Sequence, residues 1–326
     1  MNEIIFFGYN TYPKLIKNKP NKIIKPIQFK FENENENENE KQIKQISSSH
    51  YSTIFLFKNE KAIEYLKENY SNQNPSKIQI EENIQKVTVG WQNEAILTIE
   101  GNVFAKGKDI NPKNPNEFIN ISSLIEDTND RIIEDIVSEK PILMMKNVSK
   151  IFSGNSSLHV FILNSNQELF GCGWNKYGQL GLGESRKEMK IQKLTKIQNI
   201  PKGKIIDIQS GNFHSIMLIE YQNPKRKLYS CGYYRYNGLG KDEDTYEFTE
   251  IKSSLFENDD NILEFSVGNY HTLILTSNSK LIGFGDNYYD ELRNGNTNTQ
   301  LSPIQIELPK LRFNENISNY HISCGL

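Results

Sequence analysis

The sequence predicts an all-β fold made of repeated four-stranded antiparallel blades, and three observations support this. A strand ending in glycine recurs along the chain, a glycine-rich turn follows it at a nearly constant distance, and the repeating unit is about 57 residues long. A unit of that length holds several short strands of alternating character joined by turn residues, which is typical of an antiparallel blade. One blade cannot bury both of its faces, so we expect the units to stack side by side.

The first repeated element is an extended segment that ends in glycine, followed by a short turn, often a histidine, and an apolar strand. Clear copies begin at Lys150, Ile205 and Leu263, fainter copies at Lys44 and Gln85, and the segment HISCGL ends the chain. The glycine column consists of Gly90, Gly154, Gly211, Gly268 and Gly325, with Ser49 in the first copy. The last three intervals are 57 residues each, and this regularity defines the repeat.

The second element follows about 20 residues later and reads as a short strand, a glycine, a polar turn and Leu-Gly. Its copies are LFGCGWNKYGQLGLG from Leu169, LYSCGYYRYNGLG from Leu228 and LIGFGDNYYDELRNG from Leu281, with IIFFGYNTYPKL at the start of the chain and degenerate members from Lys61 and Asn102. We expect these glycines where a turn needs a positive φ or where two backbones approach closely.

The segment GWNKYGQLGLG at 173–183, preceded by LFGC and SGNSSLHVFIL, resembles the regulator of chromosome condensation repeat family. The resemblance covers nearly the whole chain, is strong over 148–300 and is weak over 41–147. It implies a β-propeller, a ring of blades that numbers seven in typical members. Six glycine positions and six turn positions indicate about six blades here, with seven as the alternative. WD and kelch blades are shorter, at about 40–50 residues, so the period argues against both.

The ends of the chain predict how the ring closes. The chain starts with a copy of the second repeated element and ends with a copy of the first. Joining its ends would therefore give one composite blade without an exposed edge. The strand expected after Gly325 is missing, which predicts an incomplete closing blade or a chain shortened relative to its ancestor. We expect residues 1–326 to form a single domain.

Two segments interrupt the repeat. The alternating Glu-Asn run at 32–40 is of low complexity and has nothing to bury, which predicts a solvated loop. Residues 108–147 form an insertion in a blade connection, for which an elaborated loop is the first interpretation. A short helix is the alternative, because apolar residues recur there at helix-like spacing from Ile132 to Val137.

Composition excludes several classes of protein. With 38 Lys+Arg against 40 Asp+Glu, the near-neutral charge argues against nucleic acid as a direct ligand. The longest apolar runs are four residues, no leader is evident, and three cysteines cannot form a disulfide framework. We therefore expect an intracellular protein without a membrane segment, in the cytoplasm or alternatively the nucleus. Six lysines in the first 30 residues could contact phosphates or an acidic partner, although a solvated loop is the first interpretation.

The sequence predicts no catalytic, cofactor or metal site. His159, His214 and His271 share one repeat column, and equivalent residues on different blades lie far apart, so polar turn residues that bond backbone groups explain them. Cys172 and Cys231 are also repeat equivalents, and with Cys324 they are expected to be buried free thiols. The segment GQLGLG lacks the Lys-Ser/Thr of a phosphate loop.

Aromatic residues of the second repeated element are the best candidates for function. Four tyrosines each lie four residues after a column glycine, and we expect them to pack between neighbouring blades: Tyr12, Tyr177, Tyr236 and Tyr289. Binding hot spots favour aromatic residues and arginine. The candidate partner-binding residues are therefore Trp174, Lys176, Tyr233, Tyr234, Arg235 and Tyr288.

These observations predict a monomeric, non-enzymatic scaffold that binds a protein partner through its blade loops. The resemblance implies two alternatives, because the founding member of the family is a guanine-nucleotide exchange factor for the small GTPase Ran and binds chromatin. An exchange factor for a small Ran-like GTPase needs no catalytic side chain of the hydrolase type, so the sequence does not separate it from a scaffold. A chromatin-associated binding module is the second alternative.

Overall fold

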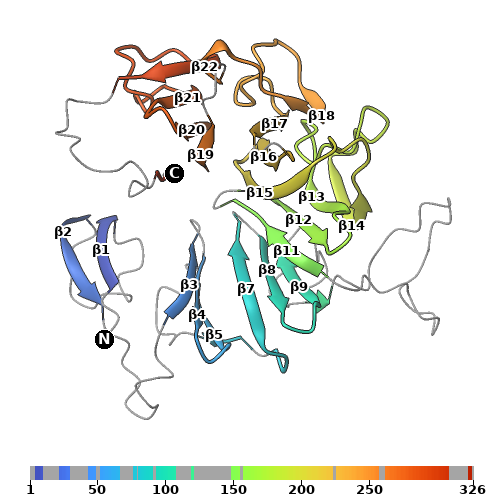
Figure 1. Cartoon of the computed structure of the whole chain (residues 1–326). Helices are drawn as coiled ribbons and strands as arrows, with labels where there is room; N and C mark the ends of the chain where they lie inside the picture. Colours follow the sequence, from blue (N-terminus) through green and yellow to red (C-terminus); the bar gives the residue numbers. More distant parts are fainter. Residues whose placement is uncertain are drawn as a thin grey trace.

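In the computed structural model, short antiparallel sheets follow one another in chain order around a ring (Figure 1). The structure describes residues 4–9, 22–29, 43–48, 52–66, 76–78, 80–90, 93–107, 119–120, 148–154, 157–222, 225–256, 261–307 and 322–324. Apart from the 3-10 turn η3 (Ser254–Phe256), every regular element in these ranges is a strand. The predicted all-β fold is confirmed.

Five sheets have four strands each, in chain order from one edge of the sheet to the other. The first sheet contains β3 (Ile43–Ser48), β4 (Ser52–Phe57), β5 (Ala62–Leu66) and β6 (Ser76–Lys77). The second contains β7 (Ile84–Val89), β8 (Asn93–Thr98), β9 (Val103–Gly107) and β10 (Ile119–Asn120). The third contains β11 (Val148–Phe152), β12 (His159–Asn164), β13 (Leu169–Trp174) and β14 (Lys190–Lys196). The fourth contains β15 (Lys204–Ser210), β16 (His214–Glu220), β17 (Arg226–Gly232) and β18 (Thr245–Glu250). The fifth contains β19 (Ile262–Val267), β20 (His271–Thr276), β21 (Leu281–Gly285) and β22 (Gln300–Ile306).

A sixth, two-stranded sheet of β1 (Ile4–Tyr9) and β2 (Lys22–Phe29) lies between the first sheet and the C-terminal segment (Figure 1). Residues 322–324 lie beside β19, where the amide of Ile322 donates to Glu264 Oε2 at 3.2 Å and that of Cys324 to Ser266 Oγ at 2.8 Å. The C-terminal segment is therefore attached to the fifth blade, on the side of the two-stranded sheet (Figure 1). Within the described residues the two-stranded sheet is smaller than the other five, and six sheets agree with the predicted number.

The hydrophobic core lies between the blades rather than inside them. Each of four buried clusters combines side chains from two neighbouring sheets. In the largest, Phe161 of β12 is fully buried together with Met217 and Ile219 of β16. Burial of apolar area drives this stacking, because a single blade would leave both of its faces in water.

The innermost strands are joined across the blades by polar side chains. Gln209 spans from β15 to β19, donating from Nε2 to the carbonyl of Phe265 at 3.0 Å and accepting from the amide of Val267 at 3.1 Å. Lys86 of β7 donates in the same way to the carbonyl of Ile151 at 3.0 Å. Burial lowers the pKa of Lys86, and the nearby Asp207 partly offsets this effect.

The two ends of the ring differ in their connections. In each blade the start of the second strand lies beside the end of the third strand, as His214 of β16 pairs with Gly232 of β17. The turn before the second strand and the loop after the third strand therefore lie on the same face of the ring, which we call the turn face. The opposite, hairpin face carries the connections between second and third strands. Gly232 has a φ of +107°, and a Cβ there would lie 2.3 Å from the carbonyl oxygen of Phe213, so glycine is required, as the repeat predicted.

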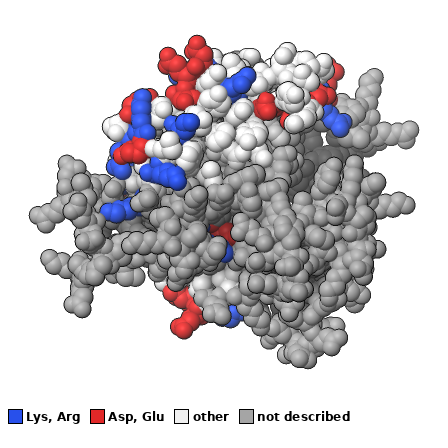
Figure 2. Space-filling model, turned by 180° about the vertical axis from the view of Figure 1, so that it is seen from behind, with Lys and Arg blue, Asp and Glu red and all other residues white. Residues whose placement is uncertain are grey.

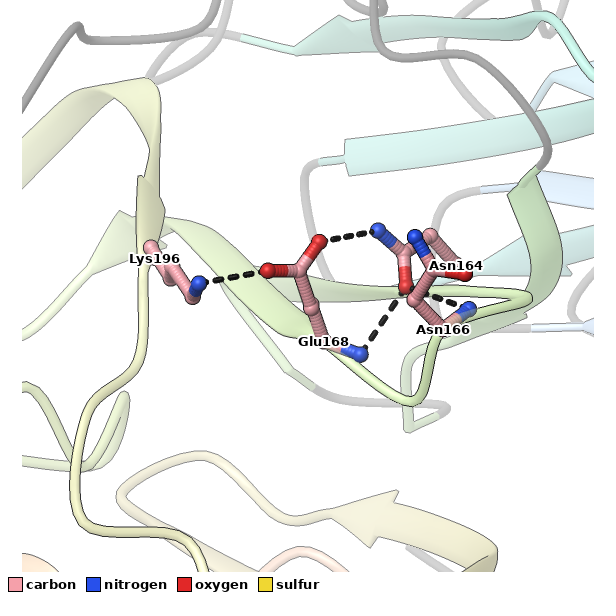
Figure 3. Close-up of polar contacts among 4 residues, drawn as sticks. All are labelled: Asn164, Asn166, Glu168 and Lys196. Atoms are coloured by element: carbon pink, nitrogen blue, oxygen red, sulfur yellow. Dashed lines mark hydrogen bonds and ion pairs between the residues drawn. The ribbon is translucent and has the colours of Figure 1, made fainter.

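Polar contacts stabilise the hairpin between β12 and β13 on the hairpin face (Figure 3). In the hairpin between β12 and β13, Asn164 Oδ1 accepts from the amides of Asn166 and Glu168, and its amide group donates to Glu168 Oε2 at 2.7 Å. Lys196 of β14 approaches Glu168 Oε1 at 2.5 Å. Hydrogen bonds from Lys196 and Asn164 lower the pKa of this exposed carboxylate. These contacts close the hairpin and attach the outer strand to it.

Several predicted segments lie outside the described residues. These are the low-complexity run at 32–40 and, except for β10, the insertion at 108–147. No helix in the described part of the chain is long and apolar enough to span a membrane.

Candidate partner-binding surface

On the turn face, two column tyrosines pack against the next blade as predicted. The ring of Tyr177, after β13, lies 5.1 Å from that of Phe213 in the first turn of the fourth blade. The ring of Tyr236, after β17, lies 5.2 Å from that of Tyr270 in the first turn of the fifth blade. Both contacts have tilted or edge geometry, which aromatic rings prefer. The same interaction is therefore repeated at successive blade boundaries.

These contacts join into one continuous surface, which we call the aromatic strip. Its half-buried members are Tyr177, Phe213, Tyr233, Tyr234, Tyr236 and Tyr270. Tyr233 connects the two boundaries, since its ring lies 4.8 Å from Tyr177, 5.2 Å from Tyr236 and 4.9 Å from Tyr234. The strip thus crosses three blades.

Buried asparagines fix the loops that carry the strip. Asn175 and Asn237, in the loops that carry Tyr177 and Tyr236, have no exposed surface. The side-chain oxygen of Asn175 accepts from the amide of Leu180 at 3.1 Å, and that of Asn237 from the amide of Leu239 at 3.0 Å. A buried amide that satisfies backbone groups holds its loop in one conformation. The strip is therefore presented by preformed loops.

The hydroxyl groups of Tyr233 and Tyr236 in the strip remain protonated near neutral pH. Burial raises the pKa of Tyr236 to about 12 and also raises that of Tyr233. A protonated phenol can both donate and accept a hydrogen bond. The strip therefore offers apolar ring area with polar edges, which suits protein recognition.

Four of the six predicted binding residues come together at this strip. Tyr233 and Tyr234 belong to it, and Arg235 is exposed beside them. Lys176 is also exposed, with its ammonium nitrogen 5.1 Å from the centroid of the Tyr177 ring. In the sequence these residues belong to two copies of the second repeated element, and the ring brings the two copies together on adjacent blades.

The other two predicted residues lie apart from the strip. Trp174 is half-buried at the end of β13, with Lys190 Nζ 5.6 Å from its ring centroid. Tyr288 is 68% exposed in the loop after β21 and packs edge-on against Tyr289. Tyr289 was expected to pack between blades, but it is 82% exposed. Tyr12 lies outside the described residues.

Phe213 and Tyr270 complete the strip, and the sequence analysis did not identify them. Both directly precede a column histidine, in SGNFHS and VGNYHT. An aromatic residue at the same place in two copies was the available signal. Its partner could not be predicted, because it lies on the preceding blade.

The column histidines differ from the prediction of polar turn residues that bond backbone groups. His159 and His214 are completely buried. Nε2 of His159 lies 2.7 Å from Ser215 Oγ of the next blade, and Nε2 of His214 lies 3.2 Å from Thr272 Oγ1 of the blade after that. Burial lowers the pKa of both histidines to about 3. These neutral side chains therefore link neighbouring blades.

The cysteines behave as predicted. Cys172, Cys231 and Cys324 are buried free thiols. Burial raises the pKa of Cys172 to about 12 and that of Cys324 to about 11, so the reactive thiolate is scarce. Within the described ranges, no group of three His, Cys, Asp or Glu side chains could hold a metal ion.

Comparison with known proteins agrees with the repeat and the fold. The sequence matches the regulator of chromosome condensation (RCC1) repeat over residues 166–218 and again over residues 262–291. The chain is an RCC1-repeat protein. The structure of human WBSCR16 superposes on this RCC1-repeat chain with a TM-score of 0.72 at 15% identity, covering 99% of this chain and 79% of that one. The structure of Prp20p from Saccharomyces cerevisiae gives a TM-score of 0.61 at 19% identity, covering 82% and 63%.

Curated relatives of this RCC1-repeat chain are considerably longer than the regions they share with it. The ultraviolet-B receptor UVR8 of Arabidopsis thaliana is 26% identical over 242 residues, which are 74% of this chain and 49% of the receptor. The secretion-regulating guanine nucleotide exchange factor of Bos taurus is 32% identical over 126 residues, 38% of this chain and 25% of that protein. The shared repeat therefore occurs in proteins with different roles.

Proposed function

We propose that this RCC1-repeat chain is a non-enzymatic scaffold that binds a protein partner through its turn face. The observation that supports the proposal is the aromatic strip, in which half-buried rings cross three blades on preformed loops. Aromatic residues and arginine supply most of the binding energy in protein interfaces, and Arg235 lies exposed at the strip. A surface that needs no rearrangement loses less entropy on binding.

A capture experiment with the full chain tests this proposal. The bait is compared with a variant carrying Tyr233→Ala, Arg235→Ala and Tyr288→Ala, and with a control carrying Gln198→Ala and Lys202→Ala, two exposed residues between β14 and β15 on the hairpin face. We expect a stoichiometric partner that the control retains and the triple variant loses at least ten-fold. Equal capture by the triple variant, with an unchanged circular dichroism spectrum, would overturn the proposal.

Exchange-factor activity is a second candidate, supported by the 32% identity to the bovine exchange factor over part of the chain. Exchange factors displace nucleotide by inserting a surface near its phosphates, so a rigid propeller loop would suffice. Catalytic amounts of the chain should then accelerate release of fluorescent GDP from a purified small GTPase. No acceleration across a GTPase panel would contradict this candidate.

The charge on the described part of one face does not favour chromatin as a direct ligand there. On the described part of the face seen in Figure 2, Lys and Arg are interspersed with Asp and Glu, with more blue on the side of β14 and β18. Phosphate binding depends on a surface of predominantly positive charge and weakens steeply with salt. We propose a monomer in the cytoplasm, for which light scattering and fluorescence microscopy of the tagged chain are the tests.

A further inference from the structure

The aromatic strip has opposite charges at its two ends. At one end, in the third blade, the ammonium group of Lys176 lies 5.1 Å from the centroid of the Tyr177 ring. At the other end, in the fifth blade, the amide of Asp286 donates to the carbonyl of Tyr270 at 2.8 Å, which places an acidic residue beside the last ring. The strip therefore runs from a cation to a carboxylate.

The loops that continue from these ends reinforce the difference. Loop 174–190 of the third blade carries four basic and two acidic residues. Its Arg186 and Lys187 form ion pairs within the loop, with Glu188 and Glu184, and Lys176 is exposed beside the aromatic strip. Loop 286–299 of the fifth blade carries three acidic residues, Asp286, Asp290 and Glu291, and one basic residue, Arg293. Both loops lie on the turn face, since each follows a third strand.

The length of the strip sets the size of the segment that could cover it. Successive ring centroids from Tyr177 through Tyr233 and Tyr236 to Tyr270 are 4.8, 5.2 and 5.2 Å apart. The path is thus at most about 15 Å, which four or five residues of extended chain would span. A longer segment would bring its flanking residues over the charged loops.

We infer that the partner presents an extended bipolar segment, with acidic residues at one end, four or five apolar residues in the middle and basic residues at the other end. The acidic end lies over Lys176, the apolar part over the rings, and the basic end over Asp286 and Asp290. This arrangement rests on the proposed function, and it follows from charge complementarity, because like charges across an interface weaken binding and select against wrong partners. A partner of a single charge would be repelled at one end of the strip.

Three fluorescein-labelled peptides test the inference by anisotropy with the full chain. Each has the centre Pro-Leu-Pro-Leu-Pro, flanked by Glu-Asp and Arg-Lys in the bipolar peptide, by acidic pairs at both ends in the second, and by basic pairs in the third. We expect the bipolar peptide to bind at least five-fold more tightly than either other peptide at low salt. The preference should shrink at 0.5 M salt, because exposed charges are screened.

Two neutralising variants assign the ends. Lys176→Gln should weaken the bipolar peptide three- to ten-fold while leaving the all-basic peptide unchanged or tighter. Asp290→Asn should weaken the bipolar peptide by a similar factor while sparing the all-acidic peptide, and asparagine suits the backbone there, where φ is +59°. The matched controls are Lys202→Gln and Glu100→Gln, exposed residues of the hairpin face, and they should change no affinity.

The outcomes separate this inference from the proposed function. If Tyr233→Ala abolishes binding of all three peptides but the wild type does not discriminate among them, the strip binds protein and the bipolar inference is wrong. If none of the peptides depends on Tyr233, their binding occurs elsewhere and the inference also fails. The capture experiment then decides separately whether the turn face binds a partner at all.

Discussion

At the scale of single residues, glycines and asparagines shape the turn face. Gly173 of β13, Gly232 of β17 and Gly285 of β21 have φ between +103° and +109°, and each pairs with a column histidine. At Gly232 a side chain would meet two obstacles, the left-handed backbone and the carbonyl of Phe213 at 2.3 Å. Gly295, in the loop after β21, has a φ of +78°, and a Cβ there would find no atom within 4 Å. Comparing the two positions therefore separates the cost of the left-handed backbone from the cost of the clash with Phe213.

We predict that Gly232→Ala lowers the free energy of unfolding by about 3 kcal/mol, because backbone strain and backbone collision add. Gly295→Ala should lower it by about 1 kcal/mol, because only the strain applies. Urea denaturation followed by circular dichroism measures both. Equal effects of the two substitutions would show that the close approach to Phe213 is not limiting.

At the scale of elements, neighbouring blades are joined by repeated contacts of two kinds. Apolar clusters fill the space between sheets, and buried histidines bond hydroxyl groups of the next blade. His159 and His214 are neutral in the folded chain, because burial lowers the pKa of each to about 3. In the unfolded chain they have the ordinary pKa of about 6.5. Folding therefore excludes protons that the unfolded chain binds.

This difference predicts a dependence of stability on pH. Below pH 6.5 the unfolded chain binds more protons than the folded chain, so stability is complete above this pH and falls as the pH decreases toward 3. Each histidine should cost about 1–2 kcal/mol between pH 6.5 and 5. Urea unfolding at several pH values measures the slope.

The variant His159→Gln/His214→Gln provides the comparison for this prediction. It should have a flatter stability profile between pH 7 and 5 than the wild type, whatever its stability at pH 7. Burial raises the pKa of Asp207, so this carboxyl group makes the folded chain relatively more stable as the pH decreases. Because Asp207 is present in both proteins, it does not affect the comparison. An unchanged slope would show that the histidines become protonated without unfolding.

At the scale of the whole molecule, the C-terminal segment is attached to the fifth blade. Residues 322–324 lie beside β19 and bond Glu264 and Ser266, as the amide of Gln209 bonds β19 from the other side. The thiol of Cys324 also contacts the carbonyl of Ser266 at 3.1 Å. Cys324 is therefore a natural reporter of this attachment.

We predict that Glu264→Ala combined with Ser266→Ala speeds the reaction of Cys324 with a thiol reagent by about ten-fold, since removing about two hydrogen bonds favours local opening. Cys172 and Cys231 lie in other blades and serve as internal controls, with unchanged rates. Mass spectrometry of labelled peptides identifies each cysteine. Equal acceleration at all three would indicate global destabilisation and contradict a local opening.

Much of this architecture could be predicted because it repeats. The period of 57 residues predicted the blades, and the glycine column predicted the turns. The packing of Tyr177 and Tyr236 between blades was also predictable, since a residue repeated at one column occupies the same place in each blade. Tyr289 occupies the same column in the sequence, but its side chain is exposed in the structure. Exposure depends on the residues of the neighbouring blade, which the column does not specify.

The sequence by itself determined the repeat, the all-β blades and the residue types at each column, because these are local preferences of turns and strands. Only the tertiary structure decided which side chains meet. The bonds from His159 to Ser215 and from His214 to Thr272 join residues 56 and 58 positions apart, and the rings of the aromatic strip come from three blades. Such pairs form because the ring brings successive repeats into contact, and no local pattern specifies which face of a blade its neighbour will cover.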